Sequence, residues 1–275
     1  MAESFGTDPE RYDRARPRYP RAMVEAIMAA SPGRDVLDVG VGTGIVARQF
    51  QAAGATVLGV DVDARMAGYA RQRGTEAEVA AFEDWDPAGR TFDLVIAGQT
   101  WHWIDPVAGA AKAAEALRPG GRLAVFWNAF EPPAELRAVM ADASRQAMVG
   151  QAVPDQTVPD QAARPRDAKT PQVATSAFGT MSAAEGYSLM RAKAAGGVRE
   201  AGGFGDMEEW RFEWERSYTR DEWLDQIPTS GGLAQAPPEK LSALLAGVGS
   251  AIDGIGGSFT ARYTTVVGIA ARTGA

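Results

Sequence analysis

The stretch VLDVGVGTGIVARQF, residues 36–50, constrains the fold more than any other part of the sequence. An apolar run leads to three glycines spaced as G-x-G-x-G, at Gly40, Gly42 and Gly44, and a helix-like apolar pattern follows. Glycine has no side chain, so a turn built from it lets a ligand approach the main chain closely. A strand, a glycine turn and a helix in this order indicate the first unit of an alternating β/α fold.

Short apolar runs continue to alternate with helical patterns as far as residue 130. Helical segments begin near Thr43, Asp63 and Asp105, where the two aspartates are suited to cap a helix and Pro106 suits the first helical position. This alternation predicts a doubly wound, mostly parallel sheet that binds ligands at the carboxyl ends of its strands. The expected strands of this part are Asp35–Val39, Thr56–Val60, Glu78–Ala81, Phe92–Ala97 and Arg122–Trp127.

The chain after residue 130 has a different character. Residues 208–217 alternate Trp210, Phe212 and Trp214 on one face, and Phe259–Ala270 reads as a last strand, which brings the sheet to seven strands with an antiparallel pair at its end. We expect one domain over 1–275, with a ligand-binding core over 10–130. An inserted helical cap and mobile loop is expected over 131–205, and strands and helices that complete the sheet and cap over 206–275. Helices are expected at 134–149, 219–226 and 239–252.

Composition excludes several classes of site. The chain of 275 residues has no cysteine and one histidine, so thiolate chemistry and multi-histidine metal sites are excluded, and no metal is expected. A net charge of -7 argues against a nucleic-acid partner. Neither a signal peptide nor an apolar stretch that could span a membrane is visible, so a cytoplasmic protein without membrane contact is expected. The oligomeric state is left open.

The residues around the glycine turn indicate which ligand it holds. A dinucleotide fingerprint needs G-x-G-x-x-G, but position 45 is Ile45 and the third glycine comes one residue early. Asp38 before the turn would repel a pyrophosphate and favour a cation. Asp61 ends the next strand, where a carboxylate can accept both hydroxyls of a ribose. A positively charged ligand that carries a sugar fits these features.

Together these segments resemble the class I S-adenosylmethionine-dependent methyltransferases. An N-terminal YxxxRPxYP segment, Tyr12 to Pro20, is similar to one group of these enzymes that acts on small molecules. The resemblance implies a Rossmann-like fold, S-adenosyl-L-methionine as the cofactor and a small-molecule methyl acceptor. The segments that carry it are VLDVGVGTG (36–44), GVDVDARM (59–66), FEDW (82–85), FDLVIAGQTWHWID (92–105) and LRPGGRLAVFW (117–127).

The resemblance also implies a role for individual residues. Gly40, Gly42 and Gly44 would pass close to the methionine part of the cofactor and Asp38 would lie near its ammonium group, while Asp61 would bind the ribose. The adenine would lie against Val62, with the Phe82 backbone N–H and Glu83 at its edge, although Ala81 stands where many relatives carry an aspartate. Gln99 would lie near the sulfonium and the carboxylate, and it is also a candidate catalytic residue. Arg16, with Tyr12 and Tyr19, would cover the cofactor from the N-terminal side.

His102 is the only histidine of the chain and directly follows the fourth expected strand, at the ligand-binding edge of the sheet. An acceptor that is an alcohol, phenol or ammonium must lose a proton, whereas a carboxylate has none to lose. His102 is therefore a candidate general base or, alternatively, a positioning group. Further candidates for the acceptor pocket are Tyr19, Trp101, Trp127 and Asn128. Trp103 is expected in the core, and Glu131 is either a second candidate base or a surface side chain.

Three functions remain open from the sequence. The first is a methyltransferase that moves a methyl group by in-line displacement to a small biosynthetic acceptor. The second is a non-catalytic protein that binds S-adenosylmethionine, and the third is an NAD(P)-dependent oxidoreductase, which Ile45 argues against. The sequence does not choose among methylation at oxygen, nitrogen or carbon.

Overall fold

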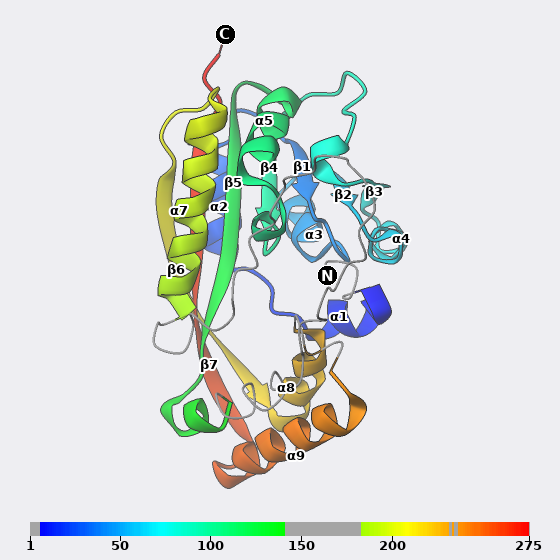
Figure 1. Cartoon of the computed structure of the whole chain (residues 1–275), viewed down its shortest axis with the longest axis vertical. Coiled ribbons are helices and arrows are strands. Elements are labelled where there is room, and N and C mark those ends of the chain that lie inside the picture. Colours follow the sequence, from blue (N-terminus) through cyan, green and yellow to red (C-terminus); the bar gives the residue numbers. More distant parts are fainter. Residues whose placement is uncertain (1–5, 141–182, 231–232, 234–235, 275) are drawn as a thin grey trace, which may run out of the picture.

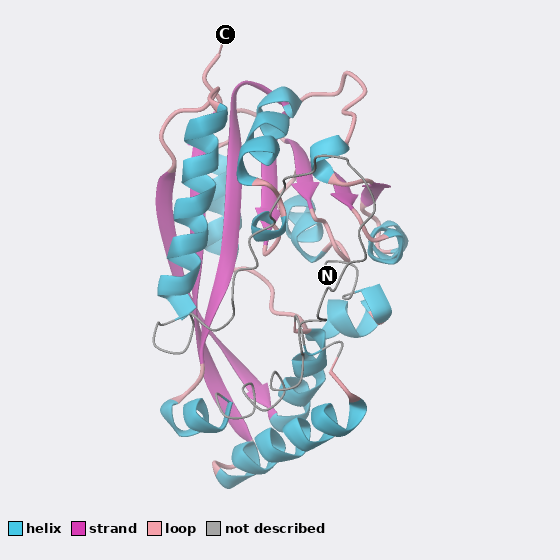
Figure 2. Ribbon diagram, in the orientation of Figure 1, coloured by secondary structure: helices cyan, strands magenta, loops and turns pink. Residues whose placement is uncertain are grey.

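The computed structural model describes residues 6–140, 183–230, 233 and 236–274. These residues form one seven-stranded sheet of order β3-β2-β1-β4-β5-β7-β6, with helices packed on both faces (Figures 1 and 2). The strands are β1 (Asp35–Val39), β2 (Thr56–Asp61), β3 (Glu76–Val79), β4 (Phe92–Gly98), β5 (Leu117–Glu131), β6 (Glu208–Thr219) and β7 (Ser258–Ala271).

The first five strands are parallel, and β7 runs antiparallel to both β5 and β6. β1 lies in the middle of the parallel part, where Val36 pairs with Val57 of β2 on one side and Leu94 of β4 on the other. The chain order reverses direction across β1 and β4, and ligands bind at such switch points in open α/β sheets. The predicted fold class, including the antiparallel end of the sheet, is confirmed.

Helices cover both faces of the sheet. Side chains of successive strand residues point to opposite faces, so each face presents apolar side chains that a layer of helices buries. Leu37 and Trp127 pack into the core beneath α5 and α7, whereas Val36 and Phe126 pack into the core beneath α2, α3 and α4. The described helices are α1 (Pro9–Ala15), α2 (Arg21–Ala30), α3 (Ile45–Ala52), α4 (Ala64–Gln72), α5 (Pro106–Ala116), α7 (Ala183–Ala201), α8 (Arg220–Gln226) and α9 (Pro238–Gly254), with 3-10 turns η2 (Phe82–Asp84), η3 (Trp101–Trp103) and η5 (Ile227–Thr229).

A second lobe forms where β5, β6 and β7 extend past the other strands. Figure 1 shows α8 and α9 beside these strand ends, at the lower end of the view. Its core contains Tyr218 and Tyr263, whose hydroxyl oxygens lie 2.6 Å apart, together with Trp223 and Ile252. Helix α1, which lies at the carboxyl edge of the sheet, packs against α8 of this lobe.

Local signals account for where the helices begin. The Asp63 side chain accepts from the Arg65 backbone N–H at 2.9 Å, and the Asp105 side chain accepts from Val107 and Ala108 in the same way. Both aspartates therefore cap their helices as predicted, and Pro106 begins α5.

Other boundaries differ from the prediction. The strand expected at 78–81 lies at Glu76–Val79, and the strand expected at 122–127 extends over Leu117–Glu131. The helix expected near Thr43 begins at Ile45, after the glycine turn. The N-terminal helix α1 was not expected, because its polar sequence has no apolar period.

The segment over 131–205 is described only in part. Residues 134–140 are helical, and the rest of the helix expected at 134–149, together with the mobile loop expected beyond it, lies outside the described residues. Within the described part of this segment, α7 packs against α5, β5 and β7, so it belongs to the layer over the sheet. None of the described helices has the length and apolar character needed to cross a membrane.

Candidate functional site

A cavity with a volume of about 360 Å³ opens at the carboxyl ends of β1, β2, β4 and β5, under α1. Its size is that of a small-molecule site. Most of the predicted site residues line it, and they come from six separate parts of the chain: Tyr12, Arg16 and Tyr19; Gly40 and Gly42; Asp61 and Val62; Phe82 and Glu83; Gln99 and His102; and Asn128.

The glycine turn forms the floor of this cavity. Gly40 and Gly42 have positive φ angles of 68° and 55°, a region that favours glycine. The Gly40 N–H donates to the Val60 carbonyl at 2.8 Å, which fixes the turn to the end of β2. A Cβ on Gly40 would lie 2.2 Å from Cγ2 of Thr100, a residue that lines the cavity and was not predicted. The turn therefore needs glycine for its conformation and, at Gly40, for space.

Two residues of the same motif do not reach the cavity. Gly44 caps α3 with φ 83°, and its missing Cβ faces Thr75 and Arg48 rather than the cavity wall. Asp38 lies on β1 and is 1% exposed, and it is not part of the lining. Its Oδ2 has no hydrogen-bond partner. Burial raises the pKa of Asp38 well above its usual range, and the neighbouring Asp61 charge raises it further.

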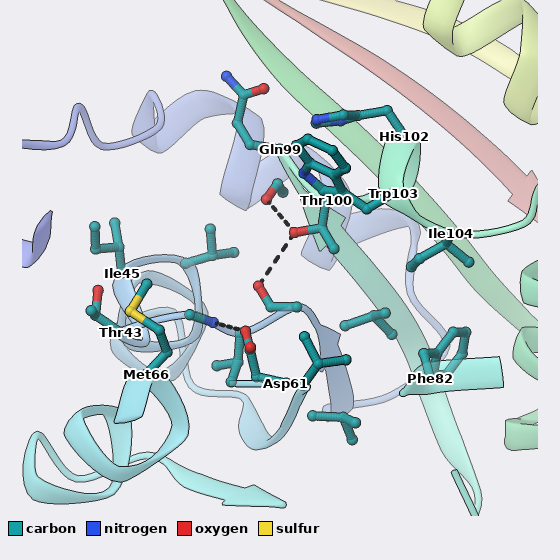
Figure 3. A pocket seen from close by; sticks show the side chains of 18 of the residues that line it. Thr43, Ile45, Asp61, Met66, Phe82, Gln99, Thr100, His102, Trp103 and Ile104 are labelled. Atoms are coloured by element: carbon teal, nitrogen blue, oxygen red, sulfur yellow. Dashed lines mark hydrogen bonds between the residues drawn. The ribbon is translucent and has the colours of Figure 1, made fainter. Parts of the chain in front are cut away.

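Asp61 is held at the cavity wall by backbone N–H groups. Its Oδ2 accepts from Gly42 at 2.8 Å and its Oδ1 accepts from Asp63 at 2.9 Å. Figure 3 shows this carboxylate beside the glycine turn. Burial raises the pKa of Asp61, and the two backbone donors lower it. Each oxygen keeps a further lone pair, so the carboxylate can accept two hydroxyl groups of a ligand.

The next wall carries the residues expected near an adenine. Phe82 lines the cavity from η2 and is 4% exposed, while Val62 is 41% exposed at the end of β2. The Glu83 Oε1 accepts from the Asp105 backbone N–H at 3.0 Å, so this side chain helps to hold the start of α5. An apolar pair beside a backbone edge suits a flat heterocycle, and the adenine contacts stay a prediction.

The N-terminal arm, α1 with residues 16–20, closes the cavity from the opposite side. Arg16 donates through Nη2 to the Thr229 carbonyl at 2.7 Å, and its guanidinium lies over the Tyr12 ring at 5.0 Å. The Arg16 Nε is buried without a partner. A buried guanidinium nitrogen that lacks an acceptor is suited to an anionic ligand group.

Ion pairs anchor this arm to the rest of the molecule. Asp225 on α8 accepts from Arg11 Nε at 2.8 Å and from Arg14 Nε at 3.0 Å. Arg48 on α3 donates to Asp13 at 2.5 Å, and Asp13 is buried. The arm is thus joined to both lobes by charged side chains, and Figure 1 shows α1 between them.

Polar side chains gather at the end of β4 and β5. Gln99 has φ 55°, which only a few per cent of non-glycine residues adopt, and its Nε2 donates to the Asn128 carbonyl at 3.3 Å. Tyr187 of α7 lines the cavity beside them and was not predicted. Burial raises the pKa of Tyr187, which a hydrogen bond with Gln99 lowers.

The tryptophans of this region divide differently from the prediction. Trp101 and Trp127 are 2% and 0% exposed and do not line the cavity, because both pack into the core under α5 and α7. Trp103, expected in the core, is 43% exposed and lines the cavity. Figure 3 shows Trp103 beside His102, whose ring centroid lies 4.8 Å away. Glu131 is exposed and lies outside the lining.

His102 lines the cavity from η3, against the buried face of the sheet. The Trp127 indole N–H donates to His102 Nδ1 at 3.3 Å. Burial lowers the pKa of His102 to about 4, and the positive charge of Lys193 on α7 contributes to the same shift. The imidazole is therefore neutral at pH 7.

Sequence reasoning missed the residues that α7 brings to the cavity, Tyr187 and Met190. Neither stands near a recognisable motif, and the segment before α7 gives no sign of where the chain returns. Thr100 and Trp103 lie inside the quoted motif 92–105, so their position after β4 was the available signal. Among the described residues, no group of His, Cys, Asp and Glu is arranged to hold a metal ion.

Comparisons with known proteins find methyltransferases among the proteins that this chain resembles. Residues 37–125 match the protein family described as "Methyltransferase domain". An uncharacterized methyltransferase of Mycobacterium bovis is 35% identical over 130 residues, which are 46% of this chain and 53% of that protein. The malonyl-[acyl-carrier protein] O-methyltransferase of Enterobacter lignolyticus is 34% identical over 138 residues, 46% of this chain and 55% of that protein. The chain thus spans about half the length of the curated relatives it matches.

Among solved structures, one named as a type II methyltransferase from Anaeromyxobacter dehalogenans has a TM-score of 0.60 at 22% identity. The match covers 94% of this chain and 97% of that one. This likeness shows the fold over nearly the whole chain. The family match covers the glycine turn and the strands around it.

Proposed function

We propose that this chain, whose residues 37–125 match a methyltransferase domain, is an S-adenosylmethionine-dependent methyltransferase for a small-molecule acceptor. The observation that carries the proposal is one cavity that joins the glycine turn, Asp61 and the N-terminal arm. Each of these three parts offers a different recognition chemistry. The acidic net charge of -7 disfavours a nucleic-acid acceptor.

The groups that line the cavity are suited to the parts of S-adenosylmethionine. Gly40 and Gly42 leave bare backbone where a methionine moiety can lie, and the Asp61 oxygens can accept the two hydroxyls of a ribose. The Arg16 Nε, which lacks an acceptor, suits the carboxylate of the methionine part. Asp38 is buried and its pKa is raised, so a positively charged ammonium or sulfonium near it would favour its ionised form.

The chain's own residues would position the reactants. S-adenosylmethionine supplies an electrophilic methyl group on a positively charged sulfur. The protein's contribution is to hold an acceptor atom in line with that group, and positioning of this kind supplies up to ~7–11 kcal/mol of the barrier. Gln99 and His102, which both line the cavity, would orient the acceptor.

Calorimetry tests the cofactor directly. We expect S-adenosylhomocysteine to bind to the purified full chain and NADH not to bind. Tight binding of NADH with none of S-adenosylhomocysteine would refute the proposal. A non-catalytic binding protein is distinguished by transfer: incubation with methyl-labelled S-adenosylmethionine and a metabolite extract should label a product, and labelled cofactor that stays intact would contradict catalysis.

A further inference from the structure

The acceptor end of the cavity is the part that the cofactor assignment leaves unexplained. Figure 3 shows Gln99 and His102 at one side of the pocket, with Asp61 and Phe82 at the other. Asn128 and Tyr187 also line this end. The chemistry of these groups bears on which acceptors can react there.

The tautomer of His102 is fixed by the core behind it. An indole N–H is only a donor, so the contact from Trp127 uses the lone pair of His102 Nδ1. Trp127 is fully buried, so the surrounding core holds its indole against the His102 ring. In the neutral ring the proton is therefore on Nε2, and the ring offers the cavity a donor.

This arrangement prevents His102 from acting as a base. Accepting a proton would need a free lone pair, and the ring has none while Trp127 donates to Nδ1. The charged group that faces the ring is Lys193 of α7, which opposes a second positive charge beside it. The His102 pKa of about 4 agrees with a ring that stays neutral at pH 7.

The other ionisable groups of the cavity give no base at this end. Burial raises the pKa of both Tyr19 and Tyr187, so both remain protonated donors near neutral pH. The two acids of the lining, Asp61 and Glu83, belong to the opposite wall, where backbone N–H groups hold them. Among the described lining residues, the acceptor end thus has hydrogen-bond donors and no group that takes a proton.

We propose that the methyl acceptor is a carboxylate and that the product is its methyl ester. The Trp127–His102 contact and the donor-lined acceptor end carry this inference, which rests on the proposed function. One carboxylate oxygen forms a bond to the methyl carbon, the methyl–sulfur bond breaks, and its electron pair stays on sulfur. The products are the ester and neutral S-adenosylhomocysteine, and no proton is released. An alcohol, a phenol or an ammonium group would each have to lose a proton to a base.

Binding of matched probes tests the acceptor class. Phenylacetate, 2-phenylethanol and phenethylamine share an aromatic ring and differ in the terminal group. We expect phenylacetate to bind the full chain saturated with S-adenosylhomocysteine about tenfold more tightly than the other two at pH 7.5, a difference of about 1.4 kcal/mol. Equal or weaker binding of phenylacetate, or no binding of any probe, would overturn the inference. Saturation with S-adenosylhomocysteine is measured first, so failure of the proposed function is seen separately.

The chemistry of the product gives a second readout. The chain is incubated with S-adenosylmethionine labelled with tritium in its methyl group and with a metabolite extract, and half of the product is treated with mild alkali. Methyl esters release labelled methanol, whereas ethers, N-methyl and C-methyl products keep the label. We expect the label to become volatile. Label that stays in alkali-stable products overturns the carboxylate and leaves the methyltransferase intact.

Two variants separate a donor role of His102 from a base role. His102→Gln keeps an N–H donor, and His102→Leu removes it. We expect ester formation in a single turnover to be faster with His102→Gln than with His102→Leu, and the wild-type rate to be level from pH 6 to 9. Equal loss in both variants, with a wild-type rate that rises with pH, would show a base and contradict the proposal.

Discussion

The indole N–H of Trp127 lies 3.3 Å from Nδ1 of His102, and this hydrogen bond joins the fully buried core of the sheet to the cavity wall. The chain has one histidine, so its imidazole signals can be read without assignment. We expect nitrogen-15 NMR to show the neutral Nε2–H form at pH 7 and a pKa of about 4. The Nδ1–H form, or a titration near 6.5, would contradict this geometry.

The same pKa predicts how stability depends on pH. The pKa of His102 is lowered to about 4 by folding from a usual value of 6.5, so between these values the unfolded chain binds the additional proton. This residue therefore makes stability fall as the pH drops from 6.5 to 4. We expect His102→Gln to flatten that part of the denaturation profile, measured by urea unfolding at several pH values. An unchanged slope would count against the low pKa.

Asp61 is predicted to be the main polar contact of the ribose. Asp61→Asn keeps an oxygen for one backbone donor and loses the charge and the second acceptor. We expect the affinity for S-adenosylhomocysteine to fall by about 1–3 kcal/mol, the scale of hydrogen bonds to charged groups. Asp221→Asn, an exposed acid on α8, is the matched control. Calorimetry that finds the same affinity in both variants would remove the ribose assignment.

The part of the cavity around the glycine turn and Asp61 could be predicted from the sequence because local rules fix it. The glycines at positions 40 and 42 are required by their backbone angles, and Asp61 follows a strand whose carboxyl end must lie beside them. Caps at Asp63 and Asp105 set the start of α4 and α5. Each of these features depends on a few neighbouring residues.

The end of the cavity at Gln99 and His102 depends on contacts between distant parts of the chain. Tyr187 reaches the cavity because α7 packs on α5 and β5, and no local pattern indicates that packing. Trp127 and Trp103 exchange their expected positions for a similar reason. Alternation along β5 places Trp127 on the inner face under α7, while Trp103 lies on a short turn that projects from the sheet edge.

The glycine turn allows a comparison between two neighbouring glycines. Gly42 and Gly44 both have positive φ, so alanine at either position should destabilise the fold by about 1–2 kcal/mol. Gly42 lines the cavity and Gly44 does not. We therefore expect Gly42→Ala to weaken binding of S-adenosylhomocysteine and Gly44→Ala to leave it near the wild-type value. Equal weakening would mean that both glycines act through the conformation of the turn.

Asp38 is expected to lower stability in the absence of ligand. Burial and the charge of Asp61 raise its pKa, so above its usual value folding is opposed by the ionised group. Asp38→Asn should raise the free energy of unfolding at pH 8 by about 1 kcal/mol and weaken cofactor affinity by a similar amount. Thermal unfolding at pH 5 and pH 8 measures the first effect, which should be smaller at pH 5. A variant less stable than wild type at both pH values would contradict it.

The N-terminal arm is predicted to be a cover whose closure depends on Asp225. Arg11 and Arg14 both donate to this carboxylate, and the same arm carries Tyr12 and Arg16 into the cavity. Asp225→Asn keeps the size of the side chain and removes the charge. The pairs are partly exposed, so each contributes about 0.2–1 kcal/mol. We expect S-adenosylhomocysteine to bind about three- to tenfold more weakly.

Salt separates this role from a general effect on the second lobe. Added salt screens partly exposed ion pairs, so wild-type affinity should fall between low and high ionic strength while that of Asp225→Asn stays nearly level. Asp253→Asn is the matched control. Asp253 lies on α9 and pairs with Arg220, which begins the helix α8 that also carries Asp225. This control should keep both the wild-type affinity and its salt dependence. If both variants bind alike, the arm is closed by its apolar and backbone contacts, and Asp225 only neutralises two neighbouring arginines.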